Sequence, residues 1–141
     1  VDIDGRVLIA DARAAVLSLR ALKGMLLDAK DHDTWSAGSF FVNPIVSTEI
    51  AATLPDDAPR WPQSDGRVKT SAAWLMERAG VKKGDCHEGA GVSTKHVLAL
   101  VNNGNAKAAD IIELARASRS AVKDKFGITL EPEVQFVGIT L

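Results

Sequence analysis

Several stretches of the chain place apolar residues at helical spacing, and short strand-like runs separate them. The longest stretch follows Asn105, a suitable N-cap, and keeps this spacing as far as Gly127, which is typical of a helix end. Its apolar positions are Ala108, Ile111, Ile112, Ala115, Val122 and Phe126. The same spacing predicts a helix that starts at Ala10 and stops at Gly24. Helices therefore account for much of the expected fold.

Two shorter helices are expected between these. Ser47 is a suitable N-cap for a helix that reaches Leu54, and Ser71 caps another that stops at Gly80. The segment 55–66 holds three of the five prolines and several aspartates. We expect this segment to be a surface loop and the best candidate for a mobile one.

Strands are predicted at residues 7–9, 97–101, 128–130 and 134–137. The run 97–101 is apolar on both faces, as in a buried strand. Helices interleaved with short strands predict an α+β (or α/β) fold: one compact domain with helices packed on a small mixed sheet.

The length and the charge of the chain exclude several classes of protein. The 141 residues, 46% of them hydrophobic, suffice for one domain with a core. Because 17 Lys and Arg face 18 Asp and Glu, the chain lacks the positive excess of a general nucleic-acid or membrane-surface binder. It also lacks an apolar run of about 18 residues, the length that a membrane span needs.

The single cysteine, Cys86, cannot form an internal disulfide, so a reducing compartment is expected. The chain starts at Val1 with no basic and then apolar leader. We therefore expect a cytoplasmic protein, and this start is compatible with a piece of a longer one.

Motifs for metals and cofactors are weak. Cys86, His87, His32 and His96 have no spacing that suits zinc, so no metal site is expected. Segment 89–94 carries only two glycines of a dinucleotide fingerprint, and no predicted strand precedes it. No cofactor-binding residue is therefore assigned, and residues that bind a flavin or nicotinamide must lie mainly elsewhere.

Several polar residues have two interpretations. Ser39 and Asn43 flank two phenylalanines before Pro44, which fits either a capped turn or a ligand-binding segment. Glu133 is either an exposed edge-strand acid or a carboxylate that faces a cleft. His96, at the start of a predicted strand, is either structural or a hydrogen-bond donor to a ligand.

Four blocks in register carry a resemblance to a known family: residues 37–44, 69–80, 92–102 and 126–134. In this order they resemble the C-terminal part of the UDP-N-acetylenolpyruvoylglucosamine reductases, also called UDP-N-acetylmuramate dehydrogenases. The resemblance runs from about residue 11 to residue 138. The loop 31–36 resembles the actinobacterial branch of this family.

The resemblance implies a role in bacterial peptidoglycan synthesis. Enzymes of this family use NADPH to reduce FAD, which passes hydride to UDP-N-acetylglucosamine enolpyruvate. The resemblance implies that residues 1–141 are the C-terminal UDP-sugar-binding domain and that an N-terminal domain binds FAD. It also implies that residues 130–141 form a strand that pairs with that N-terminal region. The family's catalytic arginine belongs to the flavin domain, so this chain alone is expected to be inactive.

The resemblance also implies residue roles. Ser39 matches the proton donor to the substrate α-carbon, and Glu133 matches a catalytic glutamate that polarises the substrate carboxylate. Asn43 and His96 match substrate-binding positions. Met25 stands where some relatives carry a diphosphate-binding lysine, so we carry that role to nearby Lys23. The alternative is a UDP-sugar-binding module without catalysis.

Overall fold

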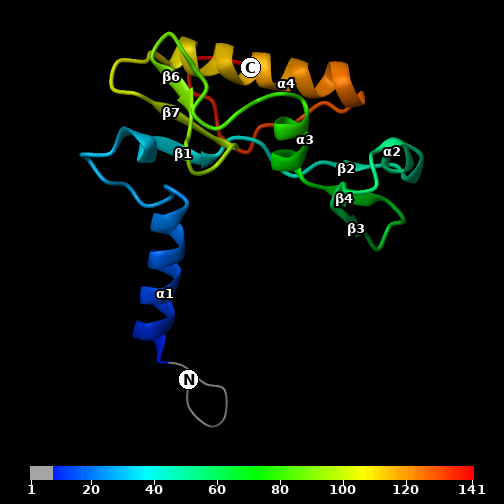
Figure 1. The fold of residues 1–141 in the computed structure, drawn as a ribbon, viewed down its shortest axis with the longest axis horizontal. Coiled ribbons are helices and arrows are strands. Elements are labelled where there is room, and N and C mark those ends of the chain that lie inside the picture. Colours follow the sequence, from blue (N-terminus) through cyan, green and yellow to red (C-terminus); the bar gives the residue numbers. More distant parts are fainter. Residues whose placement is uncertain (1–7) are drawn as a thin grey trace.

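A computed structural model describes residues 8–141. Along these residues, helices alternate with short strands (Figure 1). The elements are α1 (Ile9–Leu22), the 3-10 helix η1 (His32–Thr34), β1 (Ser36–Ser39), β2 (Ile45–Val46), α2 (Thr48–Thr53), β3 (Arg60–Pro62), β4 (Val68–Thr70), α3 (Ala72–Arg78), β5 (Cys86–His87), β6 (Ala90–Val92), β7 (Ala99–Asn102) and α4 (Ala108–Phe126). The predicted α+β class is confirmed.

The strands form two small sheets, with the orders β1-β7-β6-β5 and β2-β4-β3. Every strand pair in the described residues is antiparallel, so the expectation of one mixed sheet is wrong. Short connections account for the antiparallel pairing of β5 with β6 and of β6 with β7. A parallel pair needs a crossover of a dozen or more residues, whereas short turns join β5 to β6 and β6 to β7.

Helix α4 lies against the four-stranded sheet and contacts β6, β7 and α3 (Figure 1). Its residues Ile112, Ala115 and Val122 are buried at the predicted helical spacing. The helix ends at Gly127, whose φ of 68° is left-handed, as expected. Its N-cap is Lys107 rather than Asn105, because the side chain of Asp110 accepts a hydrogen bond from Lys107 N at 2.7 Å. Strand β7 covers most of the predicted strand 97–101.

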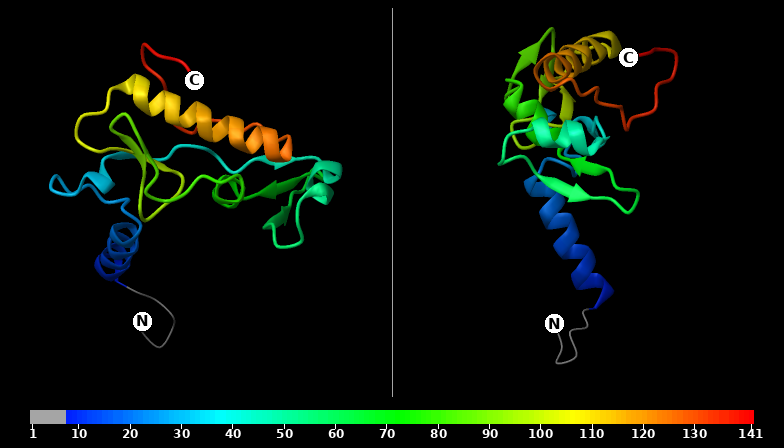
Figure 2. Two further views of the ribbon diagram at one scale, coloured as in Figure 1. Left: turned by 45° about the horizontal axis from the view of Figure 1, so that its top comes forward. Right: turned by 90° about the vertical axis from the view of Figure 1, so that its right-hand side faces the viewer.

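Helix α1 projects from the rest of the chain, as the views in Figure 2 agree. It contains no buried residue, and Val16, Leu19 and Leu22 are more than half exposed. The strand predicted at residues 7–9 is wrong in its described part, since Ile9 already begins the helix; residue 7 lies outside the described residues. The helical spacing that starts at this point overrides the short apolar run.

The small sheet and α2 form a second group of elements. The predicted surface loop 55–66 contains β3, so it is more ordered than expected. Arg60 gives the reason, because its guanidinium donates to carbonyl oxygens on the preceding turn, including those of Leu54 at 2.8 Å and Ala58 at 3.1 Å. These hydrogen bonds close the turn before Arg60, and the backbone of β3 is extended and pairs with β4.

The C-terminal segment after Gly127 holds no named strand, so the strands predicted at 128–130 and 134–137 are wrong. A single antiparallel bridge joins Pro132 to Phe41, two residues after the end of β1. Proline has no backbone N–H, so Pro132 cannot contribute a donor to a continuous ladder. The segment follows β1 for only a few residues.

Candidate functional site

A cavity with a volume of about 640 Å³ lies where the C-terminal end of α1 faces β1. It brings together four of the five residues singled out in the sequence: Lys23, Ser39, His96 and Glu133. These residues come from four separate segments of the chain. The cavity's other lining residues are Val16, Leu19, Arg20, Met25, Ala37, Gly38 and Val134.

Ser39 reaches the cavity through an irregularity in β1. Ser36 pairs with Val101 and Ser39 pairs with Ala99. Between these two pairs β1 advances by three residues and β7 by only two. The extra residue forms a β-bulge that includes Gly38, whose φ of 87° is left-handed. This bulge sets the direction in which Ser39 leaves the strand, and Ser39 lies half-buried at the cavity wall.

Glu133 lies beside Ser39 because the C-terminal segment runs along the end of β1. Glu133 N donates to Phe40 O at 2.8 Å, and Val42 N donates to Glu131 O at 3.0 Å. These two backbone bonds fix the register between the segments. The exposed side chain of Glu133 lines the cavity together with residues of α1.

His96 is half-buried, and both its backbone and its ring are held. Its ring Nδ1 accepts from Leu98 N at 3.1 Å, so the neutral ring carries its proton on Nε2. Burial is the main cause that lowers the pKa of His96, and the positive charges of Lys23 and Lys83 lower it further. At neutral pH His96 is therefore an uncharged hydrogen-bond donor.

Lys23 is the C-cap of α1, and Arg20 lies one turn earlier on the same helix. Both line the cavity, which gives it two cations on one side. Sequence reasoning missed Arg20. The signal was its spacing of three residues from Lys23, which places both on one helix face once the helix is predicted.

Asn43 is the predicted residue that the structure does not bring into the cavity. It lies just before β2, and its Oδ1 accepts from Ala72 N, the first residue of α3, at 2.9 Å. Asn43 therefore supplements Ser71, which accepts from Trp74 N as the N-cap of the same helix. The capped-turn interpretation describes this geometry.

Residues 8–141 contain no group of three or more His, Cys, Asp or Glu side chains arranged to hold a metal. Gly89 and Gly91 belong to the β5–β6 hairpin rather than to a strand-to-helix turn, so they do not form a dinucleotide-binding loop. No helix in this part of the chain has the length and apolar character to cross a membrane.

The comparisons with known proteins agree with one another. The family model described as UDP-N-acetylenolpyruvoylglucosamine reductase, C-terminal domain, matches residues 29–137. The UDP-N-acetylenolpyruvoylglucosamine reductase of Mycobacterium marinum is 55% identical over 136 residues, which cover 92% of this chain and 37% of that protein.

Two further relatives are also much longer than this chain. UDP-N-acetylenolpyruvoylglucosamine reductase 2 of Corynebacterium glutamicum is 51% identical, and the match covers 92% of this chain and 37% of that protein. The reductase of Saccharopolyspora erythraea is 53% identical, with 96% and 40% covered. The chain thus spans about 37 to 40% of the length of these curated relatives. They are actinobacterial, as the loop 31–36 predicted.

Proposed function

The chain belongs to the UDP-N-acetylenolpyruvoylglucosamine reductase family, whose C-terminal domain it matches, and from this premise we propose that it is the substrate-binding part of such an enzyme. The reaction is the reduction of UDP-N-acetylglucosamine enolpyruvate to UDP-N-acetylmuramate, a step of peptidoglycan synthesis in the cytoplasm. The observation that supports this most is the convergence of Lys23, Ser39, His96 and Glu133 on one cavity.

A glycine, Gly38, forms part of the cavity wall. A Cβ atom added at Gly38 would meet no atom within 4 Å, so the wall is open there. FAD, reduced by NADPH, supplies the hydride when bound. Because residues 8–141 offer no phosphate-binding loop of the dinucleotide type, we assign FAD binding to a separate N-terminal domain and only the substrate side to this chain.

Ser39 is the proposed proton donor. Hydride addition to one carbon of the enolpyruvyl double bond leaves an electron pair on the α-carbon, delocalised into the carboxylate. Ser39 Oγ–H gives its proton to that carbon, and the oxygen then regains a proton from water. A serine hydroxyl is a weak acid, but a carbanion is a strong base, so transfer is feasible when the bulge holds the hydroxyl close.

Glu133 is the proposed partner of the substrate carboxylate. Its position next to Ser39 lets it polarise that group while the adjacent carbon receives the proton. The side chain is exposed in this chain, so the proposal requires bound substrate and flavin to exclude water around it.

Lys23 and His96 are the proposed binding groups for the UDP-sugar. Lys23, with Arg20 beside it, supplies positive charge for the diphosphate, and His96 donates from Nε2. Asn43 is proposed to contact the UDP moiety. Because its Oδ1 is engaged by Ala72, the Nδ2 amide is the group available for that contact.

The proposed partner of this chain within the enzyme is the N-terminal FAD-binding domain. The exposed apolar residues of α1 are one surface for it to cover. Residues 130–141 are the other, since they hold no named strand and are proposed to pair with a strand of that domain.

The test is Ser39→Ala in the full-length enzyme, with the two half-reactions measured separately. We expect flavin reduction by NADPH to stay normal and flavin reoxidation by substrate to slow by about 10²- to 10⁴-fold, the usual contribution of a positioned proton donor. Glu133→Gln is expected to affect the same half-reaction.

Matched controls are Ser64→Ala and Glu131→Gln, which change exposed residues outside the cavity. If Ser39→Ala and Glu133→Gln slow both half-reactions equally, or slow neither of them, the roles proposed for Ser39 and Glu133 are contradicted. UDP-sugar binding with no turnover in the unmodified full-length protein would instead support a non-catalytic binding module.

A further inference from the structure

A partly buried carboxylate joins two loops that lie far apart in the sequence. Asp33, in η1, accepts from Thr94 N at 2.7 Å with Oδ1 and from Thr94 Oγ1 at 2.9 Å with Oδ2. The Asp33 side chain is only 15% exposed. Such charge-assisted bonds are stronger than neutral ones, so this pair is a firm attachment between segments 61 residues apart.

Lys95 adds a second attachment between the same loops. Its Nζ lies 2.9 Å from Asp31 Oδ2 and 3.8 Å from Asp33 Oδ2. The hydrogen bond with Lys95 lowers the pKa of Asp31, and the same bond raises the pKa of Lys95. We call Asp31, Asp33, Thr94 and Lys95 the aspartate clamp. Two carboxylates offset the charge of Lys95, which does not itself line the cavity.

The clamp leads directly to His96. Ser93 is fully buried, and its Oγ accepts from Lys95 N at 3.1 Å and from His96 N at 3.2 Å. Thr94 and Lys95 therefore sit in a tight turn whose last residue is His96. A turn that is held from outside by Asp33 presents the His96 ring in a fixed position.

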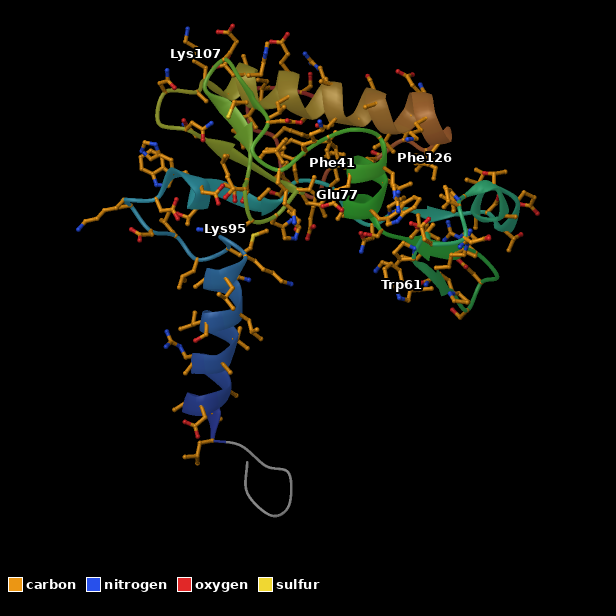
Figure 3. The ribbon with its side chains drawn as sticks, in the orientation of Figure 1. Phe41, Trp61, Glu77, Lys95, Lys107 and Phe126 are labelled. Carbon is orange, nitrogen blue, oxygen red and sulfur yellow. The ribbon has the colours of Figure 1, made fainter. Side chains whose placement is uncertain are left out.

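The clamp also lies close to Gly24, the residue after Lys23. A Cβ atom added at Gly24 would lie 3.3 Å from Asp33 O, 3.3 Å from Lys95 Cδ and 3.6 Å from Ser93 Oγ. Gly24 is buried and has a φ of 67°. Figure 3 labels Lys95 at this junction, where the end of α1 meets the rest of the chain. The clamp thus lies between the segments that carry Lys23 and His96.

We propose that Asp33 is a positioning residue of the ligand cavity: through the aspartate clamp it holds Lys23 and His96 in the arrangement that binds the diphosphate of a UDP-sugar. The identity of the ligand rests on the proposed function. Asp33 acts through its neighbours and does not touch the ligand. Preformed geometry strengthens binding because the ligand need not order these side chains itself.

The sign of one measurement separates positioning from simple electrostatics. Asp33 is an acid near a site for an anion, so its charge alone disfavours UDP, and removing that charge would tighten binding. If Asp33 instead holds Lys23 and His96 in place, removing its side chain weakens UDP binding. We expect Asp33→Ala in the full-length, FAD-loaded enzyme to weaken UDP binding about 10- to 100-fold, comparable to losing a charge-assisted hydrogen bond or two.

The experiment measures UDP affinity by calorimetry, KM and kcat for the UDP-sugar, and flavin reduction by NADPH. The expected pattern is a raised Kd and KM with unchanged flavin reduction. Asp65→Ala is the matched control, because Asp65 also forms an ion pair, with Arg67 at 2.8 Å, in an exposed turn outside the cavity. Thr94→Val is expected to weaken UDP binding in part, and Thr94→Ser to restore it.

Unchanged or tighter UDP binding in Asp33→Ala would overturn the proposal. If Asp33→Ala fails to fold, the Thr94→Val and Thr94→Ser pair decides the question, since equal affinity in both would overturn it as well. Failure of the proposed function has a different signature: the unmodified enzyme itself would not bind UDP.

Discussion

His96 combines partial burial with nearby positive charge, and its titration can therefore report on the site. Its pKa lies below the ordinary value of about 6.5. Because the folded-state pKa is lowered, the contribution of neutral His96 to stability is present above about pH 6.5 and is lost as pH falls through the folded pKa. Glu77 opposes this shift, while Lys23 and Lys83 support it.

Lys23→Met is expected to raise the pKa of His96 without returning it to the ordinary value, because burial remains the larger cause. Titration of the His96 ring by NMR measures the change, and nitrogen shifts report whether the proton stays on Nε2. Lys82→Met is the control, since Lys82 is an exposed lysine that does not line the cavity. An unchanged or lower pKa in Lys23→Met would contradict the arrangement of charges described for the cavity.

Single residues differ in how far sequence reasoning could place them. The family resemblance was needed to choose Ser39 and Glu133, because each residue alone also fits a structural interpretation. Asp33 was missed because its partner, Thr94, is 61 residues away, and no local pattern encodes such a contact. The loop 31–36 that contains Asp33 stood out only for its resemblance to the actinobacterial branch of the family.

At the scale of elements, Asn43 can be tested for a structural role apart from a binding role. Asn43→Ala removes the oxygen that accepts from Ala72 N and is expected to cost about 1 kcal/mol of stability, as for loss of a helix cap. Asn43→Asp keeps an acceptor at that place but puts a negative charge near the proposed UDP contact. We expect this variant to stay stable and to bind UDP more weakly.

Chemical unfolding measures the first effect and calorimetry with UDP the second. Thr53→Ala, an exposed change in α2, is the reference for both. Normal UDP affinity in Asn43→Asp would contradict a contact with the ligand, and unchanged stability in Asn43→Ala would contradict the capping role.

Helices were easier to predict than strands, for physical reasons. Helical spacing and local caps lie within one segment, as at Ser71, so α2, α3 and α4 follow from the sequence. A strand needs a partner. Residues 134–137 alternate half-buried and exposed side chains as a strand would, yet no neighbouring strand completes the ladder in the described residues. At segment 55–66 the error went the other way, because its composition predicted a loop and the structure has a strand there. The hydrogen bonds of the Arg60 side chain order this segment.

The whole molecule retains one feature that its own core does not explain. Its length and hydrophobic fraction predicted one domain with a core, but α1 leaves its apolar side chains outside that core. Leu22 is 75% exposed, and Leu19 is 61% exposed. An amphipathic helix gains most of its stability from packing of its apolar face, so this exposed face favours contact with a partner surface. The proposed N-terminal FAD-binding domain is such a surface.

This partner surface predicts that Leu22 matters only in the longer protein. Leu22→Ser is expected to destabilise the full-length enzyme by about 2 kcal/mol, the value of burying a leucine, and to leave the isolated chain nearly unchanged. Arg13→Ser changes the opposite face of α1 and should be neutral in both. Urea unfolding of both proteins gives the comparison. Equal effects of Leu22→Ser in the two proteins would mean that α1 docks within its own domain, because only a surface from outside residues 8–141 makes the effect depend on length.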